Sequence, residues 1–80
     1  MIILSIGGSD PSSGAGIQSD IKVFSKLDTH CLTVITAITG QNTSNFGIVE
    51  PVSKNILENQ LESIITDFKI DGIKIGMVYN

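Results

Sequence analysis

The residues of this 80-residue chain that could do chemistry begin in a glycine-rich segment, residues 7–16. Gly7-Gly8 and Gly14-Ala15-Gly16 enclose a turn that contains Asp10. Glycine lets backbone approach a ligand closely, and the helix predicted to follow offers free N–H groups in its first turn. The segment lacks the Lys-Ser/Thr ending of a P-loop and the third glycine of a dinucleotide-binding fingerprint. Its glycines alone favour a ligand-binding loop and a simple tight turn equally.

Three polar side chains, one within this segment and two after it in the sequence, each have both a structural and a functional interpretation. Asp10 precedes Pro11, which is typical of an Asx turn, and it could instead shape a site. Asp20 lies one turn into the predicted helix, where the helix dipole favours a carboxylate in any case. Gln41 follows a predicted strand, so it is either a solvated loop residue or a ligand-binding amide. Ligands of open α/β sheets bind outside the carboxyl ends of the strands, where the glycine-rich loop and Gln41 are expected to lie.

The elements that must position these residues alternate between strand and helix. Apolar runs and helical spacing predict a strand at Ile2–Ile6, a helix from Ile17, a strand at Cys31–Thr39, a polar loop at Gly40–Gly47, a helix after an N-cap at Ser53, and a strand at Ile73–Val78. In the first helix the apolar stripe is Ile17, Ile21, Phe24 and Leu27, and in the second it is Leu57, Leu61, Ile64, Ile65 and Phe68. The order β-α-β-α-β predicts an α/β fold with a parallel sheet and right-handed crossovers.

The composition of the chain excludes several classes of protein. A net charge of −3, with five Lys and Arg spread along the chain, gives no basic stripe for nucleic acid or an anionic membrane. The single cysteine, Cys31, excludes an internal disulfide, and neither it nor His30 belongs to a metal set or a catalytic triad. The apolar run at residues 1–4 is too short for a signal peptide or a spanning helix, so we expect a cytoplasmic protein.

Longer strings of residues carry a more specific signal than the glycines do. Residues 5–22 read SIGGSDPSSGAGIQSDIK; residues 34–39 read VITAIT and lead into Gln41-Asn42-Thr43; Gln60-Leu61 and the string KIGM at 74–77 follow in order. Together these strings closely resemble the hydroxymethylpyrimidine/phosphomethylpyrimidine kinases of thiamin biosynthesis, which are ribokinase-like enzymes. The resemblance spans the whole chain and implies the three-layer ribokinase-like sandwich, of which residues 1–80 would form the amino-terminal part.

The resemblance implies a role for several residues in binding the pyrimidine. Gln41 matches the glutamine that hydrogen-bonds the aminopyrimidine, a task suited to an amide with donors and an acceptor on one plane. Asp20 matches an aspartate near the hydroxymethyl group, and Met77 matches a methionine that packs on the ring. Gly8 and Ala15 match positions where small residues allow close approach of the ligand, and Asp10 would shape the site.

The resemblance also implies ATP and Mg²⁺ as co-substrate and cofactor and a homodimer for the full-length form. The nucleotide site and the catalytic base of such enzymes lie in the carboxyl-terminal part, so we expect residues 1–80 alone to be inactive. The chain departs from the family pattern at Asp28 and Asn45, where glycine is usual. Pyridoxal kinase is a second enzymatic hypothesis, because related enzymes accept pyridoxine-type alcohols in the same pocket. A non-catalytic, truncated binding module is the third, although unpaired sheet edges disfavour it.

Overall fold

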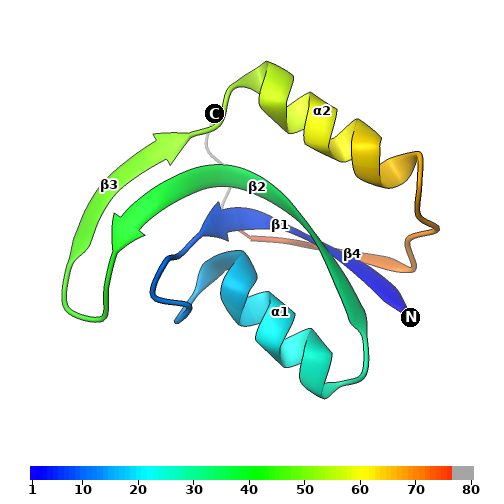
Figure 1. Cartoon of the computed structure of the whole chain (residues 1–80), viewed down its shortest axis with the longest axis horizontal. Helices are drawn as coiled ribbons and strands as arrows, with labels where there is room; N and C mark the ends of the chain where they lie inside the picture. Colours follow the sequence, from blue (N-terminus) through cyan, green and yellow to red (C-terminus); the bar gives the residue numbers. More distant parts are fainter. Residues whose placement is uncertain (77–80) are drawn as a thin grey trace.

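The chain forms one curled sheet with two helices, and the computed structural model describes residues 1–76 (Figure 1). The elements are β1 (Ile2–Ser9), α1 (Gly16–Lys26), β2 (His30–Gln41), β3 (Phe46–Pro51), α2 (Lys54–Ile65) and β4 (Gly72–Ile75). The strand order is β3-β2-β1-β4, and β1 runs parallel to both of its neighbours. The predicted α/β fold and its β-α-β-α-β unit are therefore confirmed.

Strand β3 was not predicted, and it corrects the interpretation of residues 40–47 as a polar loop. Gly40 and Gln41 extend β2, and β3 pairs antiparallel with it. The turn between them is closed by Asn42, whose backbone N–H donates to the carbonyl oxygen of Asn45 at 2.9 Å and whose Oδ1 accepts from the N–H groups of Ser44 and Asn45. β3 is a short edge strand without an apolar run, so its sequence carries little strand signal.

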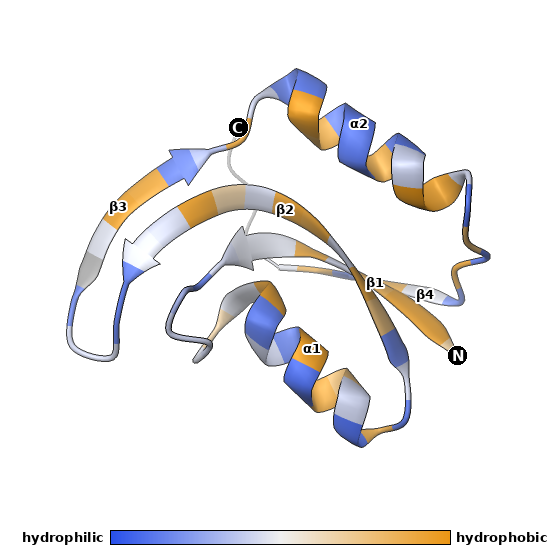
Figure 2. Cartoon of the chain, in the orientation of Figure 1, coloured by the Kyte–Doolittle hydropathy of each residue, from blue (hydrophilic) through white to orange (hydrophobic). Residues whose placement is uncertain are grey.

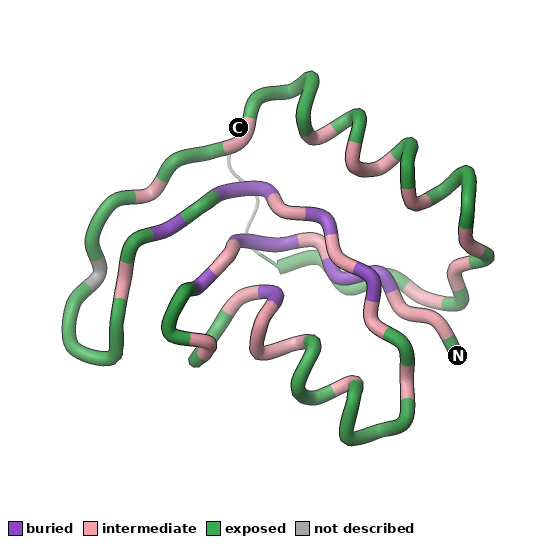
Figure 3. The backbone as a smooth tube through the Cα atoms, in the orientation of Figure 1, coloured by how far each residue is buried: buried purple, intermediate pink, exposed green. Residues whose placement is uncertain are grey.

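The two helices lie on opposite faces of the central strands (Figure 1). Successive strand residues point to opposite faces of a sheet. Leu4 belongs to the core cluster with Leu32 and Val34, against which α2 packs, whereas the neighbouring Ser5 donates a hydrogen bond to Asp20 of α1. Burial is concentrated on β1 and β2 (Figure 3).

The predicted helical stripes are only partly buried. In α1, Ile17 is buried, but Ile21 and Leu27 are exposed. In α2 and the segment after it, Leu57, Leu61, Ile64 and Phe68 pack on the core, whereas Ile65 is exposed. The exposed isoleucines of the edge strands are Ile48, Ile73 and Ile75. The helices thus cover the middle of the sheet and leave its edges open.

The start of α2 and the end of the last strand can be compared with the sequence prediction. Ser53 is the N-cap of α2, as predicted, because its Oγ accepts a hydrogen bond from the N–H of Ile56 at 3.2 Å. The last strand ends at Ile75, and residues 77 and 78 of the predicted strand lie outside the described residues. No helix formed by residues 1–76 combines the length and the apolar character needed to cross a membrane.

Candidate functional site

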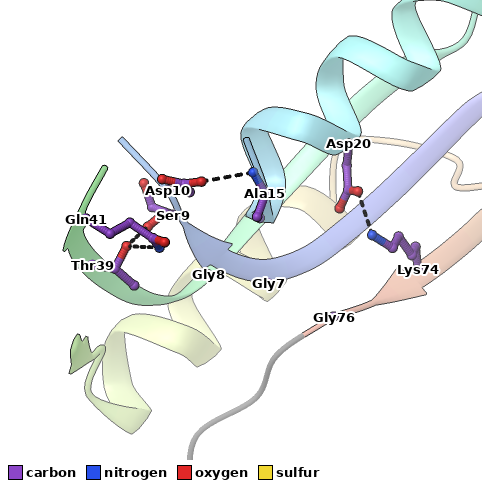
Figure 4. Close-up of a pocket in the computed structure, with 11 residues that line it drawn as sticks. Gly7, Gly8, Ser9, Asp10, Ala15, Asp20, Thr39, Gln41, Lys74 and Gly76 are labelled. Atoms are coloured by element: carbon purple, nitrogen blue, oxygen red, sulfur yellow. Dashed lines mark hydrogen bonds and ion pairs between the residues drawn. The ribbon is translucent and has the colours of Figure 1, made fainter. Parts of the chain in front are cut away.

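A pocket of about 260 Å³ opens where β1 and β2 end, beside the first turn of α1 (Figure 4). It is lined by Gly7, Gly8, Ser9, Asp10, Ala15, Gly16, Asp20, Thr39, Gln41, Lys74 and Gly76. Figure 2 shows that apolar character along β1 gives way to more neutral residues at this end of the strand. The volume suits a single small ring, because pockets for drug-sized ligands run from about 300 Å³ upward.

Gly8 and Gly16 line the pocket with backbone rather than side chain, and their backbones approach each other closely. Gly16 opens α1 with a φ of +63°, a left-handed conformation that glycine adopts without strain. A Cβ at Gly16 would collide with the carbonyl oxygen of Gly8. The close approach of α1 to the end of β1 therefore requires glycine at position 16.

Asp10 holds the loop between β1 and α1 in shape. Its Oδ1 accepts hydrogen bonds from the N–H and hydroxyl of Ser12, at 2.9 and 2.7 Å, and its Oδ2 accepts from the N–H of Ala15 at 2.9 Å. The Ser12 hydroxyl lowers the pKa of Asp10, and the backbone N–H groups of the loop add to this, which together outweigh the opposing effect of burial. The ionised carboxylate thus organises the loop, in agreement with the Asx-turn interpretation.

Gln41 is held at the pocket by a chain of hydrogen bonds that runs back to α1. Its Nε2 donates to Thr39 Oγ1 at 2.8 Å, and Thr39 Oγ1 donates to the carbonyl oxygen of Ser9 at 2.7 Å. Gln18 of α1 in turn donates to Ser9 Oγ at 2.7 Å and accepts from the N–H of Asp10 at 2.8 Å. The chain ties the ends of β1 and β2 to α1.

Asp20 forms the charged side of the pocket. Its Oδ1 lies 2.5 Å from Lys74 Nζ on β4, and its Oδ2 accepts a hydrogen bond of 2.6 Å from Ser5 Oγ on β1. Burial raises the pKa of Asp20, but the hydrogen bonds from Lys74 and Ser5 and the charge of Lys74 outweigh it, and the net pKa lies below its ordinary value. The pocket therefore contains an ionised carboxylate at neutral pH.

Cys31 does not line this pocket. Burial raises the pKa of the Cys31 thiol, and the nearby charge of Asp20 raises it further, so the thiol stays protonated and unreactive. No group of three or more His, Cys, Asp or Glu side chains among residues 1–76 could hold a metal ion.

The structure brings together five of the six residues named as candidates from the sequence. Gly8, Asp10, Ala15, Asp20 and Gln41 all line the pocket. Met77 lies outside the described residues.

The lining also includes Thr39 and Lys74, to which the sequence assigned no role. A signal for Lys74 was present, because it lies between apolar residues of the predicted strand Ile73–Val78, and a lysine among buried residues is usually paired. Thr39 gave no such signal, since threonine is ordinary in strands.

The arrangement suits recognition of a small polar ring that carries a hydroxyl group. The Gln41 amide offers both a donor and an acceptor, and each Asp20 oxygen has a second lone pair beyond its present partner. Gly8 and Ala15 leave room beside them for a flat ring.

Comparison with known proteins identifies several relatives. A family model described as phosphomethylpyrimidine kinase matches residues 10–80. A hydroxymethylpyrimidine/phosphomethylpyrimidine kinase from Rhizobium meliloti is 49% identical over 77 residues, covering 96% of this chain and 29% of the relative. Among solved structures, a phosphomethylpyrimidine kinase from Clostridium difficile superposes with a TM-score of 0.95 and is 46% identical, covering 100% of this chain and 37% of that one.

A pyridoxal kinase from Staphylococcus aureus in complex with AMP-PCP is also similar, with a TM-score of 0.88 and 38% identity, covering 99% of this chain and 29% of that one. The chain thus spans about three tenths of the length of these curated kinases.

Proposed function

The chain belongs to the phosphomethylpyrimidine kinase family and has the expected ribokinase-like fold, and from this we propose that its pocket binds a pyrimidine alcohol. The proposed substrates are 4-amino-5-hydroxymethyl-2-methylpyrimidine and its monophosphate. The intact protein would phosphorylate both with ATP, towards thiamin diphosphate. We propose the cytoplasm as the location of this reaction.

One observation carries the proposal: Gln41 and Asp20, which lie 21 positions apart in the sequence, line the same small pocket. The Gln41 amide would pair with the amino group and the neighbouring ring nitrogen of the pyrimidine. The ionised Asp20 would accept a hydrogen bond from the hydroxymethyl group and so orient its oxygen. Gly8 and Ala15 would flank the ring.

Phosphoryl transfer depends mainly on positioning the acceptor and stabilising charge on the transferring group. The hydroxymethyl oxygen would attack the γ-phosphorus of ATP, the bond to the β–γ bridging oxygen would break, and ADP would leave as the hydroxyl proton is lost. Residues 1–76 would supply the acceptor side of this reaction. We assign the base that takes the proton to none of them.

The second candidate is phosphorylation of pyridoxal, and the similarity to a pyridoxal kinase favours it. A third is a binding module without catalysis. We propose the following test: incubate the intact natural protein with ATP and Mg²⁺, add the aminopyrimidine alcohol or pyridoxal, and measure ADP release and the phosphorylated product. A higher kcat/KM for the pyrimidine is expected. A preference for pyridoxal would replace the first candidate, and saturable pyrimidine binding without turnover would support the third.

A further inference from the structure

We propose that Thr39 determines the substrate specificity of the pocket by fixing the direction in which the Gln41 amide faces. Thr39 would be a positioning residue that need not touch the ligand itself. This inference rests on the proposed function, because it concerns recognition of the pyrimidine ring. It follows from the direction of two hydrogen bonds.

In the first hydrogen bond, the Thr39 hydroxyl donates its only proton to the backbone of Ser9. Thr39 Oγ1 lies 2.7 Å from the carbonyl oxygen of Ser9. A carbonyl oxygen can only accept, so the hydroxyl must donate. Thr39 is 8% exposed, which leaves little access for water to compete for this proton.

The second hydrogen bond then has a single permitted direction. With its proton used, Thr39 Oγ1 can only accept, and the Gln41 atom at 2.8 Å from it must be the donor Nε2. The opposite orientation of the amide would place two acceptors, Oε1 and Oγ1, against each other. The amide is therefore fixed, and its Oε1 and second N–H remain for a ligand in the pocket that Gln41 lines.

The partner of Thr39 is itself held in place. Ser9 ends β1, and its hydroxyl accepts a hydrogen bond from Gln18 of α1 at 2.7 Å. Gln18 also accepts from the next backbone N–H, that of Asp10. The carbonyl oxygen that receives the Thr39 proton therefore belongs to a segment anchored from both β2 and α1.

A fixed acceptor beside a fixed donor selects one pattern on the ligand. The Gln41 amide would pair with an amino group next to an unprotonated ring nitrogen, as a glutamine does when it forms two hydrogen bonds with adenine. A 4-oxo pyrimidine presents the reverse pattern, with an acceptor towards Oε1 and a ring N–H towards the amide N–H. Pyridoxal has no amino group beside a ring nitrogen and could satisfy only one of the two positions. A freely rotating amide would accept the amino and oxo rings alike.

The test compares two ligands on the intact protein by calorimetric titration: 4-amino-5-hydroxymethyl-2-methylpyrimidine and its 4-oxo analogue. The wild-type protein should bind the amino compound at least about tenfold more tightly, because the oxo compound leaves two polar groups opposed. Thr39→Val should reduce this preference to within about threefold, since the amide can then rotate. Thr39→Ser retains the hydroxyl and should restore the preference.

Each outcome separates this inference from the proposed function. Equal binding of both ligands by the wild-type protein would overturn the inference, and so would an unchanged preference in Thr39→Val. Absence of binding of either ligand by the wild-type protein would contradict the proposed function instead. Thermal unfolding shows whether Thr39→Val folds. If it does not, Thr39→Ala removes the hydroxyl without adding a methyl group next to Ser9, and the same loss of preference is expected.

Discussion

Lys74 of β4 and Asp20 of α1 form an ion pair at the edge of the pocket, with Nζ 2.5 Å from Oδ1. The pair joins residues 54 positions apart in the sequence. Lys74 is half exposed, whereas the Asp20 side chain is only 14% exposed. The lysine therefore acts mainly on the charge state of the more buried carboxylate.

The first prediction concerns the pH dependence of pyrimidine binding. Asp20 has a folded pKa below its ordinary value of 3.8, so its ionised form favours the folded state above that pH, and this contribution is lost as the pH falls through the folded pKa. In Lys74→Met, burial is opposed by Ser5 alone, and the pKa of Asp20 should rise. Protonation of Asp20 would remove the carboxylate proposed to accept a hydrogen bond from the hydroxymethyl group. The fall in pyrimidine affinity at acidic pH, measured by calorimetry, should therefore begin at a higher pH in Lys74→Met than in the wild type.

Two controls accompany this change. Lys74→Arg keeps the charge and should retain the wild-type profile, and Lys22→Met removes an exposed lysine of α1 and should leave it unchanged. The free energy of unfolding of Lys74→Met should fall by less than about 1 kcal/mol, because a half-exposed pair contributes little. A profile of Lys74→Met that superimposes on the wild type would refute the role of the ion pair.

The second prediction compares two glycines of the loop. Gly16→Ala should lower the free energy of unfolding by about 2 kcal/mol or more, because the new Cβ meets the carbonyl oxygen of Gly8 at a positive φ. Gly14→Ala should change it by no more than about 0.5 kcal/mol, since its Cβ would lie 3.8 Å from Asp10 and Ser12 side-chain atoms. Urea unfolding of the intact protein measures both, and equal effects would count against this geometry.

The third prediction concerns Gln60 of α2, whose amide pairs with the backbone of Ile35. The N–H of Ile35 donates to Oε1, and Nε2 donates to the carbonyl oxygen of Ile35, each at 2.8 Å. The side chain thus serves as a strand partner just before the stretch of β2 that pairs with β3. Gln60→Ala should cost about 1–3 kcal/mol in the free energy of unfolding, because both backbone groups lose their partner.

Asn59→Ala provides the matched control for Gln60→Ala, because Asn59 is the exposed neighbour on the same helix. It should alter the free energy of unfolding by no more than about 0.5 kcal/mol. Comparable losses in the two variants would mean that Gln60 contributes only as a helix residue.

The fourth prediction concerns Asp28, which follows the C-cap of α1 with a φ of 57°. This is the left-handed conformation that usually ends a helix at glycine. Asp28→Gly should therefore raise the free energy of unfolding by about 0.5–1 kcal/mol. Asp28→Ala keeps a Cβ and should give no gain. Stabilisation by alanine equal to that by glycine would show that φ is not the cause.

The sequence predicted the helices and strands whose apolar residues show strong periodicity. It also predicted the end of the sheet at which the pocket lies. Parallel β1 and β2 both end at one edge of the sheet, so the last residues of these strands, Gly8 and Gln41 among them, lie there together with the loop that follows β1. The departure at Asp28 was also informative, because the structure shows there the left-handed backbone for which glycine is usual.

The sequence did not predict features that depend on contacts between distant residues. β3 has a weak strand pattern and is held by pairing with β2. The role of Lys74 arises from an ion pair with α1, and that of Thr39 from the direction of one hydroxyl proton. Ile21 and Ile65 matched the helical period yet are exposed, because each helix covers only part of the sheet.

A crystal structure of the intact protein with 4-amino-5-hydroxymethyl-2-methylpyrimidine bound tests the central claim most directly. We expect the ring between Gly8 and Ala15, with its amino group at Gln41 Oε1 and its hydroxymethyl group beside Asp20. A ring bound outside this pocket, or one turned so that the hydroxymethyl group meets Gln41, would contradict the assignment of the site.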